Sequence, residues 1–220
     1  MFLFISSNII FGQITLTVKP TFNGKSIKKN YWYITNNKDS IQIKKVQFYL
    51  TDVKIKSSEN IIFSIDDSNY LIDVFTPETL KRSLQNTSIK NIKEISFNIG
   101  VQDSLNTIGA LADDLDPSKG MYWSWQSGYI NFKIEGISPS CKTRKNKFQF
   151  HIGGYQQPYK TTIRVSFQVK NTSNKNIIIH LNIADFFTKV HLKSENQIMI
   201  PGKKAKKIAD SLPKIFSIDE

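Results

Sequence analysis

The sequence predicts an all-β protein, an antiparallel β-sandwich-like single domain with long loops and one or two short helices. First, residues rich in Ile, Val, Phe, Tyr and Thr recur with a period of two, the spacing of side chains on one face of a strand. Second, helical periodicity is confined to two short stretches. Third, no repeat or low-complexity linker divides the 220 residues, of which 40% are hydrophobic, enough for one packed core.

The expected strands follow one another along most of the chain. The 41–55 segment changes phase near Lys44-Lys45 and again near Thr51-Asp52. A turn cluster at 171–174 separates the last two strands, so we expect them to form an antiparallel hairpin. The expected strands are 14–18, 41–55, 61–65, 70–74, 95–99, 148–152, 163–169 and 177–183.

Two segments have helical signals. Thr76-Pro77-Glu78 has the capping hydroxyl and first-turn proline of a helix start, and leads into Leu80 and Leu84. After Pro201-Gly202, an apolar stripe follows at helical spacing. The segment 102–120 is instead a long loop, and loops of that length tend to be functional. The stripe consists of Ala205, Ile208, Ala209 and Leu212.

The segment 120–129 contains two of the three tryptophans. In a strand, Trp123 and Trp125 would point to the same face. Further along, Ile130, Phe132 and Ile134 occupy the opposite parity, so we expect a glycine β-bulge at Ser127-Gly128. From the residues alone, the paired indoles are either aromatic core or part of a site.

Residues 1–12 are uncharged and mostly apolar, which is typical of a secretory signal peptide; the alternative is a buried first strand. Removal of the signal would leave a domain over 13–220 in the periplasm or secreted. No apolar stretch approaches the roughly 20 residues of a membrane-spanning helix. The only cysteine, Cys141, cannot form an internal disulfide, and its basic neighbours can lower its pKa.

The formal net charge of +12 includes lysine-rich clusters at 142–147 and 203–207. Such clusters suit an anionic partner or serve as a solvated face. No nucleic-acid-binding motif accompanies them, so we expect no nucleic-acid partner. No catalytic motif is present either, and we expect that the protein is not an enzyme.

Two sets of residues have the chemistry of metal ligands. His151 alternates with Phe150 and Ile152 and points away from the apolar face, whereas His180 and His191 read as surface residues. Carboxylates gather in the 102–120 segment, where oxygen ligands suit calcium and turn formation explains the same residues equally. These carboxylates are Asp103, Asp113, Asp114 and Asp116, with Asn106 among them.

Several blocks of the chain, in this order, resemble the MbnP-like family of exported proteins. The most specific block is LDPxxGMYWxWQSGY, which ends at Tyr129, and the others are individually weak. The resemblance covers nearly all of the chain after the expected signal. The blocks are 48–52, 70–73, 97–103, 109–117, 120–129 and 150–154.

This resemblance implies an exported β-sandwich-type protein that binds copper. The family's namesake is associated with methanobactin, a copper-chelating natural product. Characterised relatives use histidines and a kynurenine made from tryptophan, which a di-haem protein related to cytochrome c peroxidases oxidises. On this chain, Trp123 or Trp125 would be the modified residue and His151 the matching imidazole, a ligand type that suits copper.

Two functions therefore remain open. The first is an exported copper-binding or copper-handling protein. The second is a non-metal ligand- or partner-binding module that keeps the fold but lacks a working copper site, because only three histidines are available.

Overall fold

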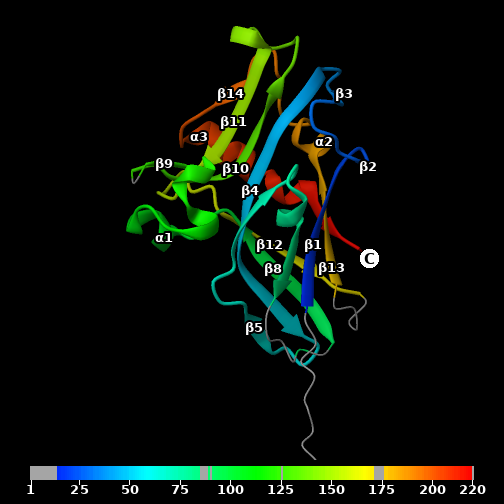
Figure 1. The fold of residues 1–220 in the computed structure, drawn as a ribbon, viewed down its shortest axis with the longest axis vertical. Coiled ribbons are helices and arrows are strands. Elements are labelled where there is room, and N and C mark those ends of the chain that lie inside the picture. The colour runs from blue at the N-terminus through cyan, green and yellow to red at the C-terminus, as the bar shows by residue number, and fades with distance from the viewer. Residues whose placement is uncertain (1–13, 85–88, 90, 125, 171–175, 220) are drawn as a thin grey trace, which may run out of the picture.

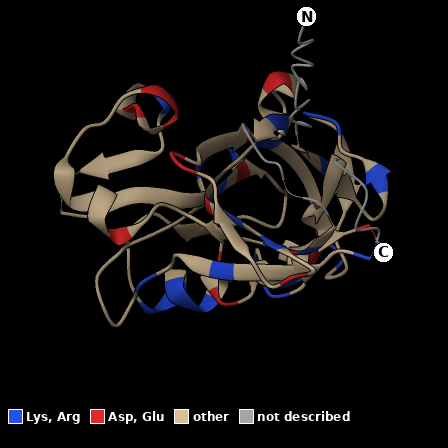
Figure 2. Cartoon of the chain, turned by 90° about the horizontal axis from the view of Figure 1, so that it is seen from below, with Lys and Arg blue, Asp and Glu red and all other residues tan. Residues whose placement is uncertain are grey.

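The computed structural model describes residues 14–84, 89, 91–124, 126–170 and 176–219, and within them it contains two β-sheets (Figure 1). Seen from below, the strands curl around the protein interior (Figure 2). The predicted all-β sandwich is confirmed. The expected signal peptide at residues 1–12 lies outside the described residues.

The smaller sheet has five strands and is built around β1, which pairs in parallel with β13 and antiparallel with β2 and β7. Thr15 lies opposite Asn176, so strands from the two ends of the chain are neighbours. The strands are β1 (Ile14–Phe22), β2 (Lys25–Ser26), β7 (Lys81–Leu84), β13 (Asn176–Asn182) and β15 (Phe216–Ile218).

The larger sheet has ten strands, and β4 runs through its centre between β8 and β10. Four short strands lie outside the main strand order: β3, β5 and β6 pair with β4, and β9 pairs with β10. The strands are β3 (Trp32–Ile34), β4 (Ser40–Ser57), β5 (Ile62–Ser64), β6 (Asn69–Asp73), β8 (Ile92–Ile99), β9 (Tyr122–Ser124), β10 (Gly128–Ile137), β11 (Lys147–Gly153), β12 (Ile163–Gln168) and β14 (Gln197–Ile198).

Within the described residues, three short α-helices and five 3-10 turns connect the strands. The stripe predicted after Pro201 is helical, and its four apolar residues are buried. The helices are α1 (Asp103–Ile108), α2 (Ile183–Phe186) and α3 (Lys203–Ala209), and the 3-10 turns are η1 (Pro77–Leu80), η2 (Asp113–Leu115), η3 (Pro117–Lys119), η4 (Arg144–Asn146) and η5 (Leu212–Ile215). None of the helices in the described residues is long and apolar enough to cross a membrane.

The main hydrophobic core lies between the two sheets, and aromatic rings join its parts. Phe216 of β15 packs edge-on against Phe48 of β4, with ring centroids 5.4 Å apart. Phe186 of α2 stacks on Phe132 of β10 at 5.6 Å. Each buried ring of this size contributes a few kcal/mol to folding. Cys141 belongs to this core, and burial raises the pKa of its thiol to about 11.

The predicted hairpin and the first predicted helix are wrong. The strands at 163–169 and 177–183 do not form a hairpin, because β12 pairs with β8 in the larger sheet while β13 joins the smaller one. The turn cluster at 171–174 lies outside the described residues. The helix predicted from Thr76 is a single 3-10 turn, since the chain resumes a strand at Lys81 to pair with β1, and Leu84 belongs to that strand.

Both predicted phase changes in the 41–55 segment are confirmed. In the pairing of β10 with β4, Lys44 is skipped between Ile43 and Lys45. In the pairing of β4 with β8, the register shifts between Thr51 and Lys54. These irregularities let one long strand serve as the partner of several neighbours while keeping its apolar side chains buried.

The strand predicted through the tryptophan segment is instead a hairpin. Strand β9 ends at Ser124, β10 begins at Gly128, and these two residues are antiparallel partners. Gly128 has a φ of +71° and an irregular register follows it, but the phase change of the apolar residues lies at Asn131. There, Ile130 pairs with Gly153 while Phe132 pairs with Ile152, which is a β-bulge.

The bulge places Ile130 on the opposite face from Phe132 and Ile134, so the prediction that the three share one face is wrong. The side chain of Asn131 is buried at the bulge. It accepts a hydrogen bond from the amide of Val101 at 2.9 Å and donates to Thr161 Oγ1 at 2.9 Å. Gly100 lies so close that a Cβ there would overlap this side chain.

We predict that Asn131→Ala destabilises the protein by roughly 1–3 kcal/mol, because the buried amide of Val101 loses its acceptor. Chemical denaturation would measure the change, with the exposed Asn36→Ala as the control. A loss no larger than that of the control would show that the bulge does not depend on this side chain.

Candidate functional site

The outer face of the larger sheet, turned away from the smaller sheet, carries a second hydrophobic cluster beneath the segment 102–124. Neighbouring residues of β4 illustrate the division: Phe48 points into the main core and Tyr49 into the outer cluster. Partly buried Leu105, Leu111 and Trp123 pack against this cluster. Its buried members are Tyr49, Leu71, Val101, Leu115, Met121, Tyr129 and Ile130.

Asn106 of α1 ties this covering segment to the sheet. It is buried, accepts a hydrogen bond from the amide of Tyr129 at 2.8 Å, and donates to the carbonyl of Gln102 at 2.9 Å. A Cβ at Gly128 would overlap the Asn106 amide, and the positive φ of Gly128 is the second reason for glycine there. The long loop expected at 102–120 is therefore an ordered cover that includes one α-helix.

Trp123 lies on the same face of β11 as His151. A Cβ built on Gly153 would come within 2.8 Å of Cζ3 of Trp123, so the indole rests against the glycine backbone. Residues 151 and 153 alternate along β11 and face the same side, about 7 Å apart along the strand. The structure thus places two of the expected site residues on the same face of β11. The third, Trp125, lies outside the described residues.

His151 is buried although its side chain points away from the main core. Its Nε2 lies 2.6 Å from Oε1 of Glu135 on β10, so the ring donates a hydrogen bond to that carboxylate. Its Nδ1 is also buried and has no hydrogen-bond partner among the described residues. An imidazole held at one nitrogen and unsatisfied at the other has the donor atom that a metal site requires.

Lys133 lies directly opposite His151 in the pairing of β10 with β11. It is buried, and its ammonium donates a hydrogen bond to the carbonyl of Gly120 at the start of the tryptophan segment. On its other side lies Gln47 of β4, whose Oε1 is buried without a partner in the described structure. A polar row of Gln47, Lys133 and His151 therefore crosses the outer face beside the hydrophobic cluster.

Burial and hydrogen bonding shift the pKa values of the charged groups in and beside this row. The hydrogen bond from His151 lowers the pKa of Glu135, and the nearby charges of Lys133 and Lys45 lower it further. Burial lowers the pKa of Lys133. Glu135 therefore stays ionised at neutral pH and balances the cationic character of the row.

The other two histidines lie elsewhere, and the predicted calcium ligands have other partners. His180 contacts the carboxylate of Asp219, and His191 is exposed. Asp114 forms a salt bridge with Arg82, with Oδ2 and Nη2 2.9 Å apart. Asp103 forms one with Lys160, with Oδ2 and Nζ 2.7 Å apart. The remaining two acids of the expected calcium set are Asp113, which is exposed, and Asp116, which accepts a hydrogen bond from the amide of Ser118.

The described residues contain no group of three or more His, Cys, Asp or Glu side chains that could hold a metal ion. The four carboxylates of the 102–120 segment are thus not brought together, and Asp114 serves instead to anchor the segment. Its Oδ2 also accepts a hydrogen bond from the amide of Leu71 at 3.0 Å. Calcium binding by these residues stays a prediction.

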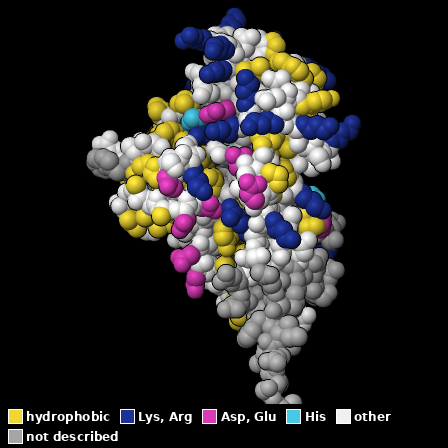
Figure 3. Space-filling model, viewed as in Figure 1, with side chains coloured by type: hydrophobic (Ala, Val, Ile, Leu, Met, Phe, Trp, Pro, Cys, Tyr) yellow, Lys and Arg dark blue, Asp and Glu magenta, His cyan; other side chains and the backbone are white. Residues whose placement is uncertain are grey.

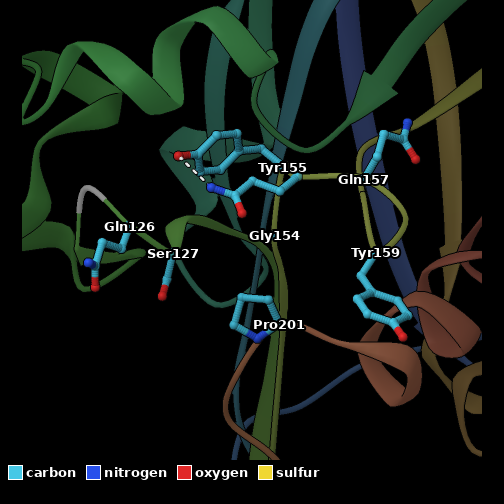
Figure 4. Close-up of a pocket in the computed structure, with 8 residues that line it drawn as sticks. Gln126, Ser127, Gly154, Tyr155, Gln157, Tyr159 and Pro201 are labelled. Atoms are coloured by element: carbon cyan, nitrogen blue, oxygen red, sulfur yellow. Dashed lines mark hydrogen bonds between the residues drawn. The ribbon is translucent and has the colours of Figure 1, made fainter.

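A pocket of about 130 Å³ opens beside the end of the tryptophan hairpin (Figure 4). Gln126 and Ser127 come from the hairpin, and the segment after β11 supplies Tyr155 and Tyr159. The close-up shows Pro201 from a third segment lying between these two groups. The lining carries no formal charge. It consists of Gln126, Ser127, Gly154, Tyr155, Gln156, Gln157, Tyr159 and Pro201.

Comparisons with known proteins identify the family and the fold. The model of the MbnP family matches residues 11–200. The chain belongs to the MbnP family. The fold is similar to that of MbnP from Methylosinus trichosporium, with a TM-score of 0.59 and 13% sequence identity over 83% of this chain and 79% of that one. No curated protein matches the sequence.

For this MbnP-family chain, sequence reasoning found His151 and Trp123 but missed the two residues that define their surroundings. Lys133 and Glu135 alternate with Phe132 and Ile134, and this pattern reads as an ordinary solvent-facing side of a strand. Their importance comes from pairing with β11 and from the cover over the outer face. The cross-strand partner of Lys133 could be named only once the register was known.

We predict that Glu135 makes the stability of the protein sensitive to acid. Because its pKa is lower in the folded state, its contribution is fully present above the unfolded value of about 4.3 and is lost as the pH falls through the folded value. Urea denaturation between pH 6 and pH 3, as rough limits around that window, should show a smaller acid loss in Glu135→Gln than in the unmodified protein. Equal slopes for the two proteins would contradict this assignment.

Proposed function

We propose that this member of the MbnP family is an exported copper-binding or copper-handling protein that holds the metal at His151 beside Trp123. The observation that carries the proposal is the buried imidazole of His151, with its unpartnered Nδ1, on the strand face where the Trp123 indole rests against Gly153. Imidazole nitrogen is a ligand that copper favours. Export and maturation by a di-haem peroxidase-like partner belong to the same proposal.

The residues fit copper in part. His151 supplies an imidazole and Glu135 a carboxylate, and their facing atoms are 2.6 Å apart. Two protein donors leave the set incomplete, and the ammonium of Lys133 on the same face disfavours a cation. A kynurenine formed from Trp123 or Trp125 would add the missing donor. The bound metal would supply a redox-active centre at this face of the sheet.

We predict that His151→Ala removes the tightest copper site. Titration against a competing copper chelator would measure the affinity, with His191→Ala as the control because His191 is exposed on a different segment. The control should bind as the unmodified protein does. Equal affinities in all three proteins would remove His151 from the site and overturn the proposal.

The kynurenine is tested separately by the intact mass of the protein from its native host. Peptide mapping should place the mass increment of tryptophan-to-kynurenine conversion on Trp123 or Trp125. Unmodified tryptophans in protein that still binds copper through His151 would leave the metal proposal standing and remove the kynurenine from it.

A second function, binding of a neutral ligand without a metal, is favoured by the uncharged pocket in Figure 4. Two tyrosine rings and several amide groups line it, a combination that suits a hydroxyl-rich ligand such as an oligosaccharide. It lies at the end of the same tryptophan hairpin. This function would retain the family fold and use neither His151 nor Glu135.

We predict, for this second function, that neutral oligosaccharides shift the backbone amide resonances of Gly154, Tyr155 and Gln156. Tyr159→Ala should abolish the shifts because Tyr159 forms one wall of the pocket, whereas the distant Tyr31→Ala should retain them. Absence of shifts in the unmodified protein with a broad oligosaccharide panel would argue against this function.

A further inference from the structure

One end of the larger sheet combines basic and apolar side chains from three separate parts of the sequence. In one register row, Trp32 of β3 lies opposite Gln42 of β4, which lies opposite Ile137 of β10. Ile137 in turn lies opposite Lys147, the first residue of β11. The segments 25–38, 40–47 and 136–149 therefore meet at this end, which we call the basic-aromatic end.

The basic-aromatic end is strongly basic. Its three segments contain four, two and four Lys or Arg residues, ten of the 30 in the chain, and none of the 18 Asp and Glu residues. Two acidic residues border the segments: Asp39 is buried, and Glu135 lies opposite Lys45 and Gln149 with its carboxylate held by His151. Within the described structure, none of these ten cations forms an ion pair. Figure 3 shows Lys and Arg gathered at the upper end of the molecule with hydrophobic side chains beside them.

The apolar part of this end is an edge strand. Tyr31, Trp32 and Ile34 are 56%, 47% and 57% exposed, and they lie on or next to β3, which pairs only with β4 in the described sheet. Trp32 and Ile34 alternate along β3 and so share one side. Exposing an indole and an isoleucine side by side to water is unfavourable. Together with neighbouring lysines that form no ion pair, these exposed apolar side chains indicate a contact surface.

We propose that the basic-aromatic end docks on the surface of an anionic phospholipid bilayer. Indole and phenol rings are favoured at the headgroup level, where the ring contacts acyl chains and the polar group stays hydrated. Lysines at the same height meet the lipid phosphates. A polyanion such as nucleic acid would pair with the lysines but would leave Ile34 exposed to water. A bilayer offers phosphates to the lysines and acyl chains to the apolar side chains.

The proposal is tested by co-sedimentation of the full chain with vesicles of phosphatidylcholine alone and of phosphatidylcholine mixed with phosphatidylglycerol. We expect binding to the anionic vesicles only. The triple variant Lys28→Ser, Lys142→Ser, Lys147→Ser should bind at least roughly tenfold more weakly. The matched control Lys203→Ser, Lys204→Ser, Lys207→Ser removes the same charge from α3 and should change the affinity much less.

A substitution of Trp32 distinguishes binding to a bilayer from binding to a soluble polyanion. Anionic vesicles should shift the tryptophan emission to the blue, and Trp32→Ala should remove the shift and weaken binding. The proposal is overturned by equal losses in the two triple variants, by binding that ignores lipid charge, or by absence of binding. It is also overturned if Trp32→Ala binds unchanged while heparin competes fully, which would assign the surface to a polyanion.

Discussion

The candidate site depends on the β-bulge at Asn131, which divides β10 between two hydrophobic clusters. Before the bulge, Tyr129 and Ile130 belong to the outer cluster; after it, Phe132 and Ile134 belong to the main core. The Asn131 side chain accepts a hydrogen bond from the amide of Val101 and donates one to the hydroxyl of Thr161, so it joins β10 to the chain leaving β8 and the chain entering β12. An amide buried among apolar residues stabilises only the one arrangement in which all its partners are present.

The outer cluster then determines where the tryptophan hairpin lies. Its apolar residues need a cover, and the segment 102–124 supplies one that is pinned by Asn106 and Asp114. With the cover in place, the Trp123 indole rests on Gly153 and the ammonium of Lys133 reaches the carbonyl of Gly120. The buried polar row beside the cluster, with His151 at its end, is a consequence of the same packing.

Much of the fold could be predicted from sequence because strand periodicity reports burial directly. Even the two phase changes in β4 were visible as breaks in the alternation. Strand partners were not visible, since β12 and β13 have equally clean patterns yet belong to different sheets. In the site, His151 was identified from its parity, whereas Lys133 and Glu135 looked like solvent-facing residues. The burial of Lys133 depends on a cover earlier in the chain, where Gly120 accepts its hydrogen bond, and the half-buried Glu135 is held by His151 of the neighbouring strand. The alternation of residues within β10 contains no information about either partner.

The cover places the Trp123 indole against Gly153, on the strand face that carries His151. Nuclear Overhauser contacts between the α-protons of Gly153 and the Trp123 ring test this most directly, because an aromatic ring in contact with the glycine also displaces its α-proton shifts by its ring current. We predict such contacts, with α-proton shifts of Gly153 away from ordinary values, and a return toward ordinary values in Trp123→Leu. Ordinary shifts in the unmodified protein, with no contact to the indole, would contradict it.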